Sequence, residues 1–258
     1  MDTRRPVGQV AAVWITAGRP HRMVQNSIQP EPQIGAEFEG VKVPASPFLT
    51  EKYANWIAKG IYEKPERKLS EKLVQPGDRI IEMGAGLGFV GGYTTCKTTD
   101  TVLRSYEANP SLIPHVEALY AMNGIADRAE VRNELLVADP DAPDAVTFHI
   151  HGSFLGSSVY KVGGGHRPKL QIPTAAWAKV KQEFRPDVLI MDIEGAELEF
   201  FTHADLSGVR AIIVELHPKR YGPEGVEACV AALTAKGLSQ KHHRYEVRTF
   251  VANDAAFS

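Results

Sequence analysis

Short apolar runs alternate with longer amphipathic stretches along most of this chain. Apolar runs bounded by turn-forming residues are typical of buried strands, whereas apolar positions spaced three and four apart are typical of helices. The pattern predicts strands at 102–106, 129–132, 187–191, 209–214 and 245–251, and a further strand just before residue 84. It predicts helices at 50–59, 65–73, 114–123, 195–201 and 222–236. This alternation indicates a doubly wound, mostly parallel α/β sheet with helices on both faces.

The first 59 residues depart from this regular alternation. Short strands are expected at 10–15 and 38–43, but prolines and glycines interrupt the sequence around them, and 29–33 has the composition of a linker. We therefore expect an N-terminal extension over 1–59, acting as an arm, a cap or an oligomerisation segment. The main domain is expected over 60–258, with an insertion at about 139–180 between its third and fourth strands.

Composition excludes several classes of protein. The chain has 258 residues, a net charge of −2 and no apolar run approaching the ~20 residues that span a bilayer. Neither a basic stripe nor an aromatic stacking pattern favours nucleic acid, and no signal peptide is recognised. Cys96 and Cys229 lie too far apart to suggest a disulfide framework or a zinc site. These features lead us to expect a cytoplasmic protein without a nucleic-acid or membrane partner.

The strongest local signal is a glycine-rich turn directly after the first core strand. Glu82 ends the apolar part of that strand, and Gly84, Gly86 and Gly88 follow at alternate positions. Glycines permit positive φ and let a ligand approach the backbone closely, at the sheet edge where open α/β folds bind ligands. The spacing Gly86-Leu-Gly-Phe-Val-Gly91 also fits a dinucleotide fingerprint. However, an acid two residues before the first glycine is more typical of an S-adenosylmethionine site.

Four core strands switch from apolar residues to a carboxylate at their ends: Glu82, Glu107, Asp192 and Glu215. In a parallel sheet these acids are expected to share the ligand-binding edge. Glu107 lies where a carboxylate can accept both ribose hydroxyls of a nucleoside, a feature common to nicotinamide and S-adenosylmethionine sites. Asn133 follows the third strand, where adenine would lie, although a turn-forming role is equally consistent with its position.

The segment Asp192-Ile-Glu-Gly-Ala-Glu197 resembles the signature of the FkbM family of S-adenosylmethionine-dependent methyltransferases. Further segments resemble that family in the same order along the chain, over roughly 60–220: Gly60-Ile-Tyr-Glu63 with Glu66, Pro76-Gly-Asp78, Gly84-Ala-Gly-Leu-Gly88, Glu107-Ala-Asn-Pro110 and Ile213-Val-Glu-Leu-His217. The resemblance implies a class I (Rossmann-like) methyltransferase fold, S-adenosyl-L-methionine as cofactor and methyl transfer, usually to a hydroxyl oxygen. It implies a cofactor site containing Tyr62, Glu63, Glu82, Gly84, Gly86, Gly88, Glu107, Asn109, Asn133 and Asp192.

The chain departs from the family pattern at three positions. Glu82 and Gly86 stand where the family usually has Asp and Asn, which preserves the chemistry. Met191 stands where the family often has Lys, so a charge beside Asp192 is missing and the identity of the acceptor is left open.

Methyl transfer from a sulfonium requires alignment of donor and acceptor, together with removal of the hydroxyl proton. Asp192 and His217 are the candidates for this catalytic role, and Glu194 is a further candidate. A histidine titrates near neutrality, as a base should, but His217 could equally cap its strand end. A divalent ion at Asp192 and Glu215 is neither indicated nor excluded by the sequence.

The insertion carries the remaining candidate chemistry. His149 and His151 share one face of an alternating segment, but no third ligand lies nearby in sequence, so no metal site is predicted there. Three glycines at 163–165 precede His166 and Arg167 and are expected to form a substrate loop.

Two classes of function therefore follow from the sequence. The preferred prediction is an S-adenosylmethionine-dependent O-methyltransferase that acts on a small molecule. The alternatives are a dinucleotide-dependent oxidoreductase, or a methyltransferase that modifies a nitrogen or a macromolecule.

Overall fold

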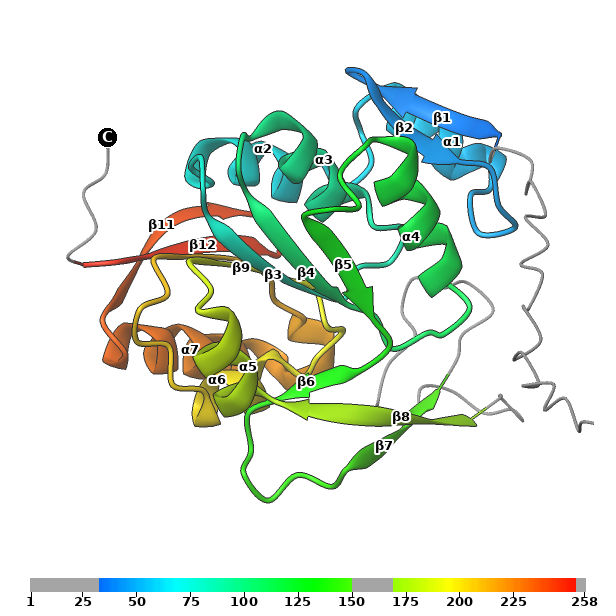
Figure 1. Ribbon diagram of the computed structural model, residues 1–258. Coiled ribbons are helices and arrows are strands. Elements are labelled where there is room, and N and C mark those ends of the chain that lie inside the picture. Colours follow the sequence, from blue (N-terminus) through cyan, green and yellow to red (C-terminus); the bar gives the residue numbers. More distant parts are fainter. Residues whose placement is uncertain (1–32, 150–168, 254–258) are drawn as a thin grey trace, which may run out of the picture. The chain divides into compact units, whose positions relative to one another are not determined.

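A seven-stranded sheet forms the centre of the fold (Figure 1). In the computed structural model, which describes residues 33–149 and 169–253, its strands are β3 (Arg79–Met83), β4 (Val102–Tyr106), β5 (Ala129–Arg132), β9 (Val188–Met191), β10 (Ala211–Glu215), β11 (Leu238–Arg244) and β12 (Val247–Ala252). Their order is β11-β12-β10-β9-β3-β4-β5. Strand β12 runs in the opposite direction to the other strands of this sheet, which are parallel to one another. The predicted mostly parallel sheet is confirmed.

Both faces of the sheet are covered by helices because successive side chains of a buried strand point to opposite faces. Ile80 packs in one apolar cluster with α2 (Lys64–Leu73), α3 (Phe89–Lys97) and α4 (Ile113–Met122). The next residue, Ile81, packs in a second cluster with α5 (Trp177–Phe184), α6 (Glu197–His203) and α7 (Pro218–Ala235). This two-sided burial explains why the central strands read as continuous apolar runs.

The N-terminal extension begins, in the described part, with a hairpin and a helix. The strand expected at 38–43 is instead two strands, β1 (Ile34–Phe38) and β2 (Val41–Pro44), because Glu39 and Gly40 both adopt positive φ and turn the chain. The helix predicted at 50–59 is α1 (Glu51–Ala58), which begins after Thr50, whose side chain accepts the Tyr53 backbone N–H.

Apolar side chains of the hairpin and α1 pack in the hydrophobic core on one face of the main sheet. Val43 and Ile57 are wholly buried in the same apolar cluster as Ile80. The predicted strand at 10–15 lies outside the described residues. A role for residues 1–59 in oligomerisation stays a prediction.

The insertion between the third and fourth core strands contains a small second sheet. Its strands are β6 (Leu135–Val137), β7 (Ala145–His149) and β8 (Lys169–Ala176), in the order β6-β8-β7. The sequence predicted β7 but neither β8 nor α5. The central strand, β8, alternates buried and exposed residues only weakly, which gives little period-two signal.

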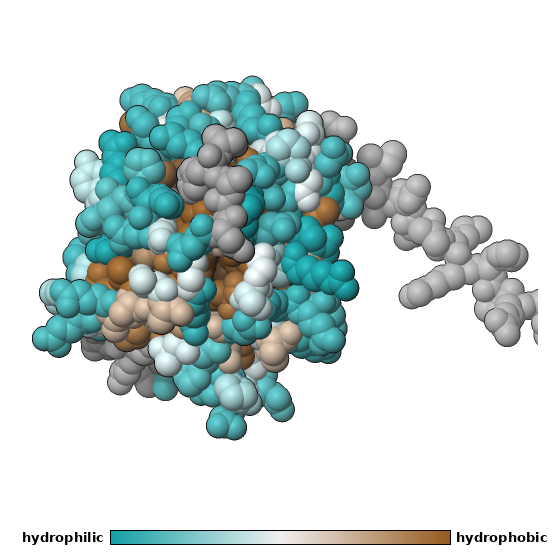
Figure 2. Space-filling view, turned by 90° about the vertical axis from the view of Figure 1, so that its left-hand side faces the viewer, coloured by the Kyte–Doolittle hydropathy of each residue, from teal (hydrophilic) through white to brown (hydrophobic). Residues whose placement is uncertain are grey.

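No helix in the described ranges is both long and apolar enough to cross a lipid bilayer. The face shown in Figure 2 is mostly hydrophilic, and its apolar side chains gather around a hollow near the centre.

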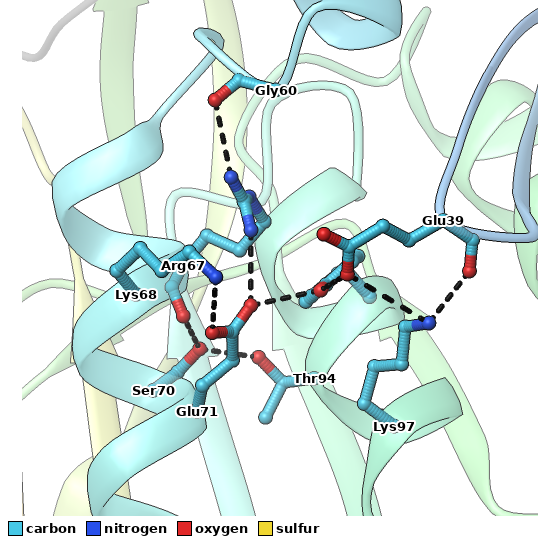
Figure 3. Close-up of polar contacts among 9 residues, drawn as sticks. Glu39, Gly60, Arg67, Lys68, Ser70, Glu71, Thr94 and Lys97 are labelled. Atoms are coloured by element: carbon cyan, nitrogen blue, oxygen red, sulfur yellow. Dashed lines mark hydrogen bonds and ion pairs between the residues drawn. The ribbon is translucent and has the colours of Figure 1, made fainter.

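A buried arginine ties the N-terminal hairpin to α2 and α3 (Figure 3). Arg67 is 1% exposed, donates to the Gly60 carbonyl at 3.1 Å and pairs with Glu71 at 2.9 Å. Its guanidinium also lies 4.5 Å from the ring centre of Phe38 and 5.0 Å from that of Tyr93. Truncation of Arg67 would remove the donor to the Gly60 carbonyl and the contacts with both aromatic rings, whereas Glu71 would keep its hydrogen bonds to Lys68 and Tyr93.

Arg67→Met is therefore expected to lower the free energy of unfolding by about 3 kcal/mol in urea denaturation, because it removes the charge-assisted hydrogen bonds and the cation–aromatic contacts of a buried side chain. Lys68→Met is the matched control, since Lys68 pairs with the same carboxylate but is 48% exposed. Its loss is expected to cost less than about 1 kcal/mol. Equal losses in the two variants would contradict a structural role for the buried guanidinium.

Candidate functional site

The register of the parallel strands places five candidate positions in one row at the edge of the sheet. Met83 pairs with Tyr106 on one side and Met191 on the other, Tyr106 pairs with Arg132, and Met191 pairs with Val214. The residues that follow these positions are Gly84, Glu107, Asn133, Asp192 and Glu215.

A cavity opens at this edge, between the main sheet and the small sheet of the insertion. Its acidic lining residues are Glu63, Glu107, Glu134, Asp192, Glu194 and Glu199. Its apolar wall includes Leu112, Leu135, Leu136, Val137, Val146, Phe148, Ile193 and Phe200. Gly84 and Gly86 also line it. Among the described residues, no lysine, arginine or histidine is part of this lining.

The glycine turn brings the ends of β3, β4 and β9 into backbone contact. Gly84 has φ +82°, and its N–H donates to the Tyr106 carbonyl at 2.9 Å. A Cβ at position 84 would lie 1.8 Å from the carbonyl oxygen of Asp192. Only glycine fits this position, so the turn leaves exposed backbone at the floor of the cavity.

Glu107 is fixed at the cavity wall by the backbone. Its Oε2 accepts the Gly86 N–H at 2.9 Å and its Oε1 accepts the Asn109 N–H at 2.7 Å. Burial raises the pKa of this carboxyl to about 7, although the backbone hydrogen bonds oppose that shift. The arrangement orients a carboxylate toward the cavity, as the predicted ribose contact requires.

Glu82 was expected at the ligand-binding edge of the sheet, but its side chain does not line the cavity there. The strand continues to Met83, and Glu82 is 3% exposed and absent from the cavity lining. Its oxygens accept the Gly91 N–H at 2.7 Å and the Ser105 hydroxyl at 2.6 Å. Burial raises its pKa to about 7. Glu82 thus holds the first turn of α3 behind the glycine loop, and a direct contact with cofactor stays a prediction.

The two asparagines hold turns within the site. The amide of Asn133 donates to the carbonyls of Glu107 and Ala108 at 2.8 and 3.0 Å, and the side chain of Asn109 accepts the Ser111 N–H. Neither asparagine lines the cavity, whereas Glu134 does. The buried Oε2 of Glu134 has no hydrogen-bond partner, so Glu134 can accept a donor from a ligand.

The segment before α2 contributes one lining residue. Glu63 lines the cavity with a left-handed backbone conformation, and burial followed by the neighbouring Glu66 raises its pKa well above the ordinary value. Tyr62 is buried and packs edge-on against Tyr53 and Phe89. Gly88 also lies outside the cavity lining, and a Cβ there would meet Val116 of α4 at 2.8 Å.

A cluster of three acids surrounds His217 at the ends of β9 and β10. Its Nε2 lies 3.5 Å from Oδ1 of Asp192 and 3.7 Å from Oε2 of Glu194. Its Nδ1 donates to Oε1 of Glu197 at 3.0 Å. Glu197 is wholly buried and also accepts the N–H groups of Ile193 and Gly195.

The electrostatics of this cluster favour a charged histidine. Burial lowers the pKa of His217, but the hydrogen bond to Glu197 and the charges of Glu197, Asp192 and Glu194 outweigh it and raise that pKa to about 9. Burial and the neighbouring Glu215 raise the pKa of Asp192 well above the ordinary value. At neutral pH His217 thus carries the proton that a general base would need to accept, and Asp192 is the better candidate for that role.

The outcome of the sequence analysis is incomplete in two ways: the structure does not describe some candidate residues, and the sequence did not indicate some residues of the site. His151, His166 and Arg167 lie outside the described residues. The burial of Glu197 was missed, because complete burial is a tertiary property with no local signature in the sequence. Strand β6, which contributes to the apolar wall, was also missed, although Leu135-Leu-Val137 is an apolar run that could have indicated it.

The family model described as the methyltransferase FkbM domain matches residues 93–246. This range contains Glu107, Asp192, Glu194, Glu197 and His217, and covers more than half of the chain. No curated protein matches the sequence.

Three of the solved structures that are similar to this chain are the following. Precorrin-6y C5,15-methyltransferase from Geobacter metallireducens is 12% identical, with a TM-score of 0.45 over 82% of this chain and 94% of that one. TYW2 of P. horikoshii in complex with MeSAdo is 15% identical, with a TM-score of 0.44 over 83% and 67%. Fibrillarin of Aeropyrum pernix, with natively bound S-adenosyl-L-methionine, is 10% identical, with a TM-score of 0.43 over 73% and 74%.

Proposed function

We propose a function for this chain on the premise that it belongs to the FkbM methyltransferase family, as the match over residues 93–246 shows. Its cofactor is S-adenosylmethionine. The proposed reaction is methylation of a hydroxyl oxygen on a small molecule. The observation that carries the proposal is the cavity at the sheet edge, in which Glu107 and Asp192 stand on either side of the glycine turn.

The residues present fit the cofactor. The carboxylate of Glu107 suits the ribose hydroxyls, and the glycine turn admits the ligand close to the backbone. Glu63 offers a carboxylate for the cofactor ammonium, and the unpartnered oxygen of Glu134 suits the exocyclic amine of adenine. Leu112 and Leu135 provide apolar surface for the purine ring.

The cofactor supplies the methyl group on a sulfonium, which is a good leaving group. The acceptor oxygen forms the new C–O bond as the C–S bond breaks, and S-adenosylhomocysteine and a methyl ether are the products. The protein must align the two reactants and take the hydroxyl proton. Asp192 lines the cavity beside the glycine turn and is the proposed proton acceptor.

The charge and polarity of the side chains that line the cavity limit which methyl acceptor can bind there. Described side chains around the cavity are acidic or apolar, and an anionic acceptor would be repelled there. A neutral or cationic hydroxylated molecule with an apolar body fits better. An acidic acceptor would have to draw its positive contacts from residues such as Arg167, outside the described part.

Glu107→Gln tests the cofactor site by calorimetric titration with S-adenosylmethionine, with NAD as the competing ligand. Wild type is expected to bind S-adenosylmethionine and not NAD, and the variant is expected to bind it about 10–100-fold more weakly, because a charge-assisted hydrogen bond contributes about 1.5–3 kcal/mol.

Glu117→Gln is the control, since Glu117 is an exposed acid on α4 outside the cavity lining. It is expected to bind like wild type. Tighter binding of NAD than of S-adenosylmethionine, or equal effects of the two substitutions, would contradict the proposed cofactor site.

A further inference from the structure

We propose that Asp192, Glu194 and His217 form a binding site for one divalent transition-metal cation of the Mn²⁺ or Zn²⁺ type. Asp192 and Glu194 follow β9, and His217 follows β10, so adjacent strands position the group. One ligating atom from each residue lies within 4.8 Å of the other two. The set is also mixed in chemistry, with one imidazole and two carboxylates.

The separations suit a shared cation. Cations of this class bind oxygen and nitrogen ligands at about 2.0–2.2 Å, so two ligands of one cation lie roughly 3–4 Å apart. The Nε2 of His217 lies 3.5 Å from the Asp192 oxygen and 3.7 Å from the Glu194 oxygen. Little movement is needed to bring all three atoms around one ion.

The histidine is oriented as metal-binding histidines are. A ligating histidine almost always donates its other ring N–H to a carboxylate or carbonyl, which fixes the ring. Here Nδ1 of His217 donates to Glu197, and Glu197 is itself wholly buried and held by two backbone N–H groups. Nε2 is thereby directed at Asp192 and Glu194.

Unpaired buried oxygens give an independent indication. Oδ1 of Asp192, the atom that faces His217, and Oε2 of Glu197 are both shielded from solvent and have no hydrogen-bond partner. Buried acceptors without donors are rare in folded proteins, and some of them are satisfied by a bound ion. The side chain of Arg220 approaches Glu194 only at 3.6 Å. Three acids around one histidine thus leave an excess of negative charge for a cation to offset.

A bound cation would lower the pKa of a coordinated hydroxyl, which is the group that must lose its proton. This role rests on the proposed methyl transfer, whereas cation binding itself does not. Binding requires a neutral imidazole, so the cation competes with protons for the site.

The test is titration with Mn²⁺ alone, followed by the electron paramagnetic resonance signal of the free ion. Wild type is expected to bind one equivalent. Glu197→Gln changes the residue that orients the histidine and is expected to weaken Mn²⁺ binding by about 10–100-fold. Glu194→Gln removes a ligand itself and is expected to weaken Mn²⁺ binding by at least as much. The control Glu227→Gln removes an exposed acid on α7, the helix that follows His217, and is expected to bind like wild type.

Calorimetry with S-adenosylmethionine on the same preparations separates the two proposals. Normal cofactor binding without Mn²⁺ binding would overturn the metal site and leave the methyltransferase proposal standing. Equal Mn²⁺ affinity in wild type and Glu194→Gln would also overturn it, because the ion would then lie elsewhere. Mn²⁺ binding lost in Glu194→Gln, with cofactor binding retained, would support the site.

Discussion

Gly84→Ala is expected to lower the free energy of unfolding by roughly 3 kcal/mol or more and to weaken S-adenosylmethionine binding more than about tenfold. The new methyl group would lie 1.8 Å from the carbonyl oxygen of Asp192, and both groups belong to backbone. Overpacking of this kind typically costs about 1–3 kcal/mol. The residue would also keep φ near +82°, which costs an alanine about 1–2 kcal/mol. Relief of the clash must move the turn that lines the cavity.

Gly77→Ala separates these two costs. Gly77 has φ +83°, but no atom lies within 4 Å of the position that its Cβ would take. Its substitution is expected to cost only the backbone term of about 1–2 kcal/mol and to leave cofactor binding unchanged. Urea denaturation and calorimetry measure both quantities. Equal destabilisation by the two substitutions would show that contact with Asp192 is unimportant.

The central sheet could be predicted because its signals are local. The strands predicted at 102–106 and 129–132 have the observed bounds, since turn-forming residues flank each of these short segments. Strand β11 was missed because its sequence, Leu-Ser-Gln-Lys-His-His-Arg, is polar after its first residue and lies at the edge of the sheet. A polar edge strand is defined by pairing with β12, a long-range contact that no local pattern contains.

Residues of the site could be predicted where an acid directly follows a strand of the parallel sheet. Glu107 and Asp192 follow their strands directly and line the cavity, as expected. Glu82 also ends an apolar run, but it pairs with Ser105 and Ile190, two residues before the row that contains Glu107 and Asp192, and its carboxylate holds the first turn of α3. An acid that lines the cavity and one that supports it therefore differ by two residues in register, and strand ends predicted from sequence are not accurate enough to resolve that difference.

The role of His217 shows a second limit. A lone histidine after a strand indicates a base, because its ordinary pKa lies near neutrality. Three acids of the 192–197 segment, Glu197, Asp192 and Glu194, instead raise that pKa to about 9. Glu197 makes the shortest of these contacts, and its orientation depends on the turn through Gly195. The electrostatics of the histidine are therefore a property of the assembled strand edge.

Asp192→Asn is expected to lower turnover by roughly 10²–10⁴-fold, the usual contribution of a positioned proton acceptor. The amide is nearly isosteric, so the affinity for S-adenosylmethionine is expected to change less than about tenfold. Turnover is measured as release of S-adenosylhomocysteine, with an acceptor selected from neutral hydroxylated compounds by the same assay. Glu227→Gln is the control for removal of an acid outside the site.

The comparison with Glu194→Gln then distinguishes how the carboxylate acts. If Asp192 only takes the proton, Glu194→Gln keeps most of the turnover, because Glu194 is not the acceptor. If both acids hold a cation, both substitutions lower turnover, and excess Mn²⁺ partly restores Glu194→Gln, in which two ligands remain. Wild-type turnover in Asp192→Asn would contradict both roles. It would move the chemistry away from Asp192, which contacts the glycine turn, lines the cavity and faces His217.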